Sequence, residues 1–122
     1  MNEFLYHYRA IYLSNYDGDS LKLDISLGMG VWLHNRSVRL FGINTPELRS
    51  QDEEEKQKAI AARDFVRRRI PEKSSLFIKT HKDKSGKYGR LLATIFLNSG
   101  ENLNRLLVDQ GFAVEKKLLK GD

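Results

Sequence analysis

The chain has 122 residues, of which 40% are hydrophobic and 30% are charged, and it has no cysteine. This length suits one compact domain over residues 1–122, and the lack of cysteine excludes disulfides and thiolate metal sites. The net charge of +5 favours an anionic partner, with nucleic acid ahead of an anionic membrane surface.

The N-terminal stretch MNEFLYHYRAIYLSN lacks the features of a secretory leader. Position 3 is an acid, and His7, Tyr8 and Arg9 interrupt the apolar residues. As the sequence stands, we expect a cytoplasmic protein, or a secreted one if a leader has been removed. Nothing approaches a membrane span, so we expect no membrane partner.

Three strands are predicted in the first third of the chain. Residues 4–13 are rich in aromatic and β-branched side chains, which favour a strand. In residues 20–27, aliphatic and polar side chains alternate strictly, which is the period of a half-buried strand. GMG at 28–30 predicts a turn, and residues 31–43 predict one or two further strands, broken near Asn35.

Residues 52–70 predict an amphipathic helix that ends before Pro71. Acids lie in its first turns and Arg67–Arg69 in its last turn, as the helix dipole prefers. We therefore interpret these arginines mainly as residues that stabilise the C-terminal end of the helix, with a nucleic-acid-binding patch as the alternative. The apolar stripe comprises Ala59, Ala62, Phe65, Val66 and Ile70.

The second half predicts two more strands, over 75–81 and 88–97, joined by the basic loop KDKSGK. A short helix is predicted within residues 99–111, with Ser99 as a possible N-cap and Gly111 as the C′ residue. The order of three strands, helix, two strands, helix predicts a mainly β protein. We expect a five-stranded barrel with two to three packed helices.

The first candidate functional segment is YDGDS, residues 16–20. Its plain interpretation is a turn before a strand, since Asp-Gly is common there. Asp19, however, has the same parity as Leu21 and Leu23, so it is expected to point toward the core at the strand's mouth. A carboxylate in that position needs a cation, a cluster of donors or a raised pKa.

The second candidate segment is VRLFGINTPE, residues 38–47. Arg39 stands between Val38 and Leu40, where a guanidinium is costly unless it meets an anion. A structural carboxylate such as Asp19 or Glu47, or a phosphate ligand, would satisfy it. NTPE alone is an ordinary turn sequence.

The third candidate segment is KSGKYGRLL, residues 84–92. It could be only a solvated hairpin. Arg90 has the parity of Leu92, which we interpret as a second inward arginine beside Arg39. Lys87 and Tyr88 precede it, a cation beside a ring on which a base can stack. Together these residues favour phosphate recognition.

The three candidate segments together are a more specific signal of function than any one of them alone. Oxygen ligands, one further carboxylate and two arginines are the inventory for metal-assisted phosphodiester hydrolysis. The segments DGDS, VRLFGINTPE and KYGRLLATIF have the order and spacing of the staphylococcal nuclease (thermonuclease) family, which the chain resembles over roughly residues 4–115. LNRLLVDQGFA resembles the helix that follows in that family. The resemblance implies an OB-fold barrel and a calcium-dependent nuclease acting on DNA and/or RNA, and we expect a monomer.

The resemblance also implies a metal site. Asp19 would be the main Ca²⁺ ligand, and the backbone carbonyl of Thr45 a further one. Asn44 falls where the family usually has a second aspartate. An amide oxygen can still ligate calcium but carries no charge, so we expect weaker calcium binding. Asp17 lies close enough in sequence to tune the site.

The remaining roles concern catalysis and substrate. By the resemblance, Glu47 orients or deprotonates the attacking water, and Arg39 and Arg90 bind the scissile phosphate and stabilise charge in the transition state. Lys87 and Tyr88 would contact the nucleotide. The C-terminal FAVEKKLLKGD lacks the tyrosines and longer tail of typical members, which leaves base stacking beyond Tyr88 unsupported.

Two alternatives stay open at this point. The first is a catalytically weak or silent OB-fold module that binds nucleic acid or protein; the retained acids and arginines argue against it. The second is a membrane-surface or partner-binding domain acting through Arg67–Arg69, against which the acidic first half of the same helix argues.

Overall fold

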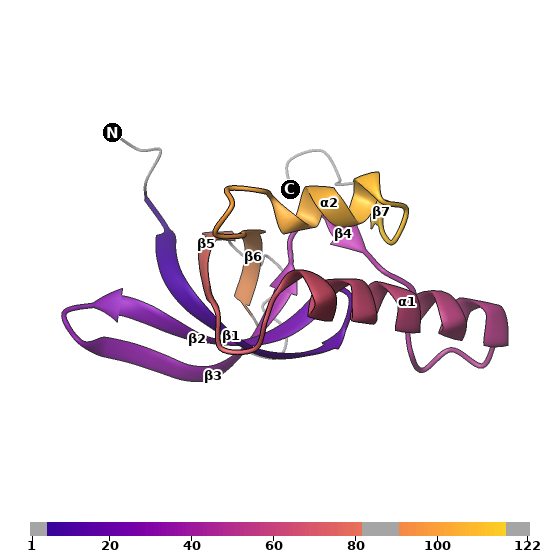
Figure 1. Cartoon of the computed structure of the whole chain (residues 1–122), viewed down its shortest axis with the longest axis horizontal. Coiled ribbons are helices and arrows are strands. Elements are labelled where there is room, and N and C mark those ends of the chain that lie inside the picture. Colours follow the sequence, from indigo (N-terminus) through magenta and orange to yellow (C-terminus); the bar gives the residue numbers. More distant parts are fainter. Residues whose placement is uncertain (1–4, 82–90, 117–122) are drawn as a thin grey trace.

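The computed structural model describes residues 5–81 and 91–116 (Figure 1). Five strands close into a barrel, two helices pack on it, and two short strands pair beside it. The barrel strands are β1 (His7–Asp17), β2 (Ser20–Gly28), β3 (Val31–Leu40), β5 (Ser75–His81) and β6 (Leu91–Phe96). The other elements are α1 (Glu53–Arg69), α2 (Leu103–Asp109), β4 (Ile43–Asn44) and β7 (Val114–Glu115).

The barrel has the strand order β1-β2-β3-β6-β5. All neighbouring pairs are antiparallel except β3 and β6, which run parallel. Helix α1 packs against β1 and α2 against β6 (Figure 1). This closed mixed barrel with two helices confirms the predicted fold class. Among the described residues, neither helix is long and apolar enough to cross a membrane.

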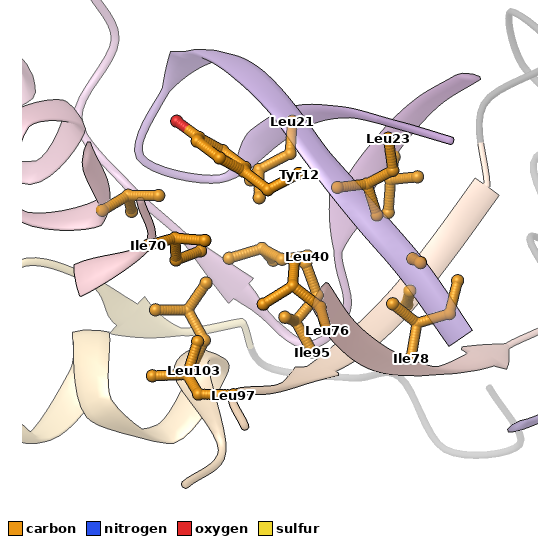
Figure 2. Close-up of a cluster of buried hydrophobic side chains, with 14 of the residues drawn as sticks. Tyr12, Leu21, Leu23, Leu40, Ile70, Leu76, Ile78, Ile95, Leu97 and Leu103 are labelled. Carbon is orange, nitrogen blue, oxygen red and sulfur yellow. The ribbon is translucent and has the colours of Figure 1, made fainter. Parts of the chain in front are cut away.

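The core fills the barrel with the inward side chains of its strands (Figure 2). Leu21, Leu23 and Ile25 of β2 are buried while the residues between them are not, as the strict alternation predicted, but Leu27 at the end of that pattern is exposed. Ala59, Ala62 and Val66 face the barrel from α1. The amphipathic pattern therefore located both a strand face and a helix face correctly.

Two features of these elements differ from the predictions, and a third agrees with them. Strand β3 is continuous, and the predicted break at Asn35 is a bulge with φ of 53°. The N-cap of α2 is Asn102, whose side chain accepts from the backbone N–H of Arg105, so the prediction of Ser99 is wrong. Gly111 follows the C-cap with φ of 82°, which confirms it as C′.

Two of the arginines at the end of α1 bind the protein's own groups. Arg67 donates from Nε to Oδ1 of Asn15 and from Nη2 to its carbonyl, both at 3.1 Å. Arg69 pairs with Glu101. These contacts agree with a structural role for both side chains.

The predicted inward face of β6 is wrong. Ala93 and Ile95 are the buried residues, whereas Leu92, Thr94 and Phe96 lie on the outer side of the barrel. Both faces of LLATIF are apolar, so its alternation could not distinguish them. Arg90, Lys87 and Tyr88 lie outside the described residues.

Candidate functional site

A polar cavity of about 430 Å³ opens where β1, β2 and β3 meet the segment that follows β4. It brings together six residues singled out in the sequence, Asp17, Asp19, Arg39, Asn44, Thr45 and Glu47. Its remaining lining comprises Tyr16, Ser20, Leu48 and Arg49. Segments 16–20 and 38–47 therefore meet in one place, as expected of a shared site.

Asp19 is the most deeply placed acid of this cavity, with 4% of its surface exposed. Its Oδ2 accepts from Nη1 of Arg39 at 2.9 Å and from the backbone N–H of Thr45 at 3.2 Å. Its own carbonyl accepts from the N–H of Leu40. The inward orientation predicted from strand parity is correct, and an arginine and a backbone donor satisfy the buried charge.

Arg39 is held from two sides. In addition to Asp19, it donates from Nη2 to the carbonyl of Ile43 at 3.4 Å and to Oδ1 of Asn44. Its strand neighbours Val38 and Leu40 point into the core, so Arg39 starts on the outer face and its guanidinium reaches the cavity. The expectation that it faces inward is wrong in this respect, and of the anions named as possible partners the structure shows Asp19. A guanidinium fixed in this way is pre-organised to bind an anion.

Gly18 lets helix α1 approach this acidic turn. A Cβ on Gly18 would lie 2.8 Å from Cβ of Ala62 and 2.9 Å from Cγ2 of Thr45, closer than side chains tolerate. Gly18 therefore fixes the turn between Asp17 and Asp19 against both the helix and the segment after β4. The sequence showed only a common Asp-Gly turn here and gave no signal of the helix contact.

The two acids of this turn affect one another. Oδ1 of Asp17 accepts from the backbone N–H of Asp19 at 3.2 Å. Burial, followed by the neighbouring Asp19 carboxylate, raises the pKa of Asp17 to about 6. The Asp17 carboxyl therefore keeps its proton to a higher pH than a solvent-exposed aspartate does.

The donor set suits a hard cation such as calcium. Oγ1 of Thr45 is buried without a hydrogen-bond partner among the described residues, and Thr45 lines the same cavity as the carboxylates of Asp17 and Asp19. Across residues 5–81 and 91–116, no three His, Asp or Glu side chains gather as a metal cluster. An ion here would therefore need carbonyl, amide or water oxygens as well, which calcium accepts readily.

Glu47 and Arg49 form the exposed edge of the cavity. Glu47 lines the same cavity as Asp19 and Arg39. Arg49 was missed by the sequence reasoning, as was its partner Tyr16, whose hydrogen bond raises the pKa of the Arg49 guanidinium. The only signal in the sequence is that Arg49 follows Glu47 by two positions in the segment after Pro46.

Comparisons with known proteins identify the family of this chain. Residues 37–121 match the family described as staphylococcal nuclease homologue. A relative from Bacillus anthracis, described as an uncharacterized protein, is 28% identical over 104 residues. That similarity covers 85% of this chain but 45% of the relative, so the chain spans less than half of its length.

Proposed function

Because the chain belongs to the staphylococcal nuclease homologue family, we propose that it is a calcium-dependent nuclease that hydrolyses phosphodiester bonds of DNA and/or RNA in the polar cavity. The observation that carries this proposal is Arg39, held by Asp19 in a cavity that also presents Glu47. A fixed guanidinium, a buried acid and an exposed acid are the groups that this hydrolysis requires.

Calcium would be held by Asp19, the carbonyl of Thr45 and the amide oxygen of Asn44, with Asp17 close by. When bound, the ion would polarise the phosphate and lower the pKa of water. Asn44 also accepts from Arg39, so it would serve the arginine as well as the metal. An amide in place of an acid predicts a loose metal site.

The chain's own residues would perform the remaining steps. Glu47 would accept a proton from the attacking water, which its exposure at the edge of the cavity permits. Arg39 would donate to the equatorial phosphate oxygens, where negative charge accumulates in the transition state. Arg90 as the second arginine and Lys87 with Tyr88 as nucleotide contacts remain predictions from the resemblance.

The test is cleavage of single-stranded DNA, single-stranded RNA and duplex DNA in millimolar calcium, with EDTA as the control. We expect EDTA-sensitive cleavage, and loss of at least about 100-fold in Glu47→Gln. Glu53→Gln is a matched control because Glu53 is an exposed acid on α1, outside the cavity. No cleavage of any substrate, with oligonucleotide binding unchanged in EDTA, would instead identify a silent nucleic-acid-binding module.

A further inference from the structure

The outer face of β1, β5 and β6 carries aromatic and basic side chains in register. Two rows cross these strands: Arg9 pairs with Phe77 and Phe77 with Phe96, while His7 pairs with Lys79 and Lys79 with Thr94. Neighbouring residues of a sheet point to the same side, so these side chains share one surface. We call Arg9, Phe77, Lys79 and Phe96 the aromatic–basic face.

The two rings of this face are partly accessible, and each contacts a neighbouring side chain. Phe77 is 43% exposed, an unusual fraction for a phenylalanine at the centre of a row. The guanidinium of Arg9 lies 5.9 Å from the centre of the Phe77 ring. The rings of His7 and Phe96 stack with centres 6.4 Å apart. The result is a layer of π-faces with cations at its margin.

The charge of the face has one sign. Within the described parts of β1, β5 and β6, the outward positions contain no acid before Asp17 at the far end of β1. Two acids that flank α2 are paired, Glu101 with Arg69 and Glu115 with Arg105, and Asp24 of β2, opposite Ile11, lies beside His34. A polyanion would therefore meet attraction from Arg9 and Lys79.

The face is continuous with the proposed catalytic site. Arg39 pairs with Leu92, and Leu92 with His81, so one row leads from the cavity onto β5. Phe77 and Lys79 follow at two-residue steps along that strand. From the backbone of Arg39 to that of Phe77 is roughly 16 Å, the span of about three nucleotides of an extended strand.

We infer that the aromatic–basic face holds the single-stranded part of the substrate that leads away from the cavity, with bases stacked on Phe77 and Phe96 and phosphates near Arg9 and Lys79. The inference rests on the proposed function in taking a polynucleotide as the ligand. A duplex keeps its bases stacked inside and cannot use the rings. Stacking and phosphate contacts do not use the 2′-hydroxyl, so DNA and RNA single strands should bind alike.

The test measures binding of fluorescent 10-mers of oligo-dT and oligo-U in EDTA, without cleavage. Phe77→Thr, which keeps a strand-forming residue, should weaken binding of both by about 5- to 30-fold, and Phe77→Trp should restore it. Lys79→Gln should lower the slope of log affinity against log salt by about 0.7. Retained affinity in Phe77→Thr, or an equal loss with a duplex of the same length, would overturn the inference.

Matched controls exist elsewhere on the barrel. Trp32→Thr removes an aromatic side chain of 36% exposure from β3, and Lys58→Gln removes a cation from α1; neither should change oligonucleotide affinity. Thermal unfolding checks that each variant is folded. Because binding is measured without calcium, the two proposals can fail separately. If the protein cleaves no substrate but its oligonucleotide binding depends on Phe77, only the proposed nuclease activity is refuted. Calcium-dependent cleavage with binding indifferent to Phe77 would refute only this inference.

Discussion

Two cavities of the barrel differ in chemistry more than in size. The polar cavity of about 430 Å³ contains Asp17, Asp19 and Arg39, whereas a larger one of about 540 Å³ lies toward the β2–β3 hairpin. The described lining of the larger cavity has no Asp, Glu, Lys or Arg; it comprises Tyr6, Tyr8, Ile25, Leu27, Leu33, Thr80, His81 and Leu91. Convergent charge, rather than volume, therefore marks the site, and the following variants test that contrast.

Arg39→Ala should have the largest effect. It removes the anion-binding group and leaves the buried Asp19 carboxylate without its partner, so cleavage should fall by at least about 100-fold. Arg39→Lys keeps the positive charge but loses the planar group that donates two parallel hydrogen bonds, so it should recover only part of the rate. Steady-state cleavage by the folded variants checks this. Near-normal cleavage in Arg39→Ala would mean that this cavity is not the reactive site.

Gly18→Ala should damage the polar cavity by steric pressure alone. The added methyl meets Ala62 and Thr45 at distances that require either the turn or the helix to move. We expect a loss of about 1–3 kcal/mol in the free energy of unfolding, with a lower rate of cleavage. Denaturant unfolding measures the first and the assay above the second. Gly30→Ala is a control from the hairpin, where the added methyl has open space but a φ of 77° strains it, so any stability loss should leave cleavage unchanged.

Asp17→Asn should stabilise the metal-free protein at neutral pH. The folded-state pKa of Asp17, about 6, lies above its ordinary value of 3.8, so ionisation costs stability as pH rises between these values. The amide avoids that cost and keeps an oxygen acceptor for the N–H of Asp19. Because Asp17 is partly exposed, we expect only about 1 kcal/mol, or roughly 4 °C in Tm at pH 7.5 in EDTA. The gain should shrink toward pH 4; a gain independent of pH would contradict this account.

Leu33→Ala should have the smallest effect on function. Leu33 is half-buried at the wall of the apolar cavity, so its truncation should cost about 1 kcal/mol of stability. Cleavage per folded molecule should stay unchanged. A rate loss comparable to that of Arg39→Ala would remove the functional contrast between the two cavities.

Much of the fold and the site could be predicted from local patterns. The alternation of residues 20–27 and the stripe of α1 fixed which sides are buried. Parity placed Asp19 correctly, and Asp19 was one of three anions named as a possible partner of Arg39, because a guanidinium between apolar neighbours requires an anion. These features depend on residues near in sequence or on charge balance, which a single sequence contains.

What could not be predicted depends on contacts between distant segments, on the path of the chain through a turn, or on segments whose pattern is ambiguous or too short. Gly18 is constrained by Ala62, 44 positions later, and nothing near Gly18 shows that approach. The contact between Asn44 and Arg39 depends on how the chain turns after β3. The orientation of β6 was ambiguous because both of its faces are apolar. Strands β4 and β7 have two residues each, too few for a periodic pattern.

The most direct measurement is a calcium titration of oligonucleotide cleavage for the wild type, Asn44→Asp and Asp19→Asn. An added carboxylate should lower the half-saturating calcium concentration by about tenfold, well inside the roughly 4 kcal/mol upper bound for such a charge pair. Loss of the Asp19 charge should raise it steeply. The account predicts three separate, EDTA-sensitive curves. Cleavage that ignores EDTA, or three identical curves, would contradict a calcium site in the polar cavity.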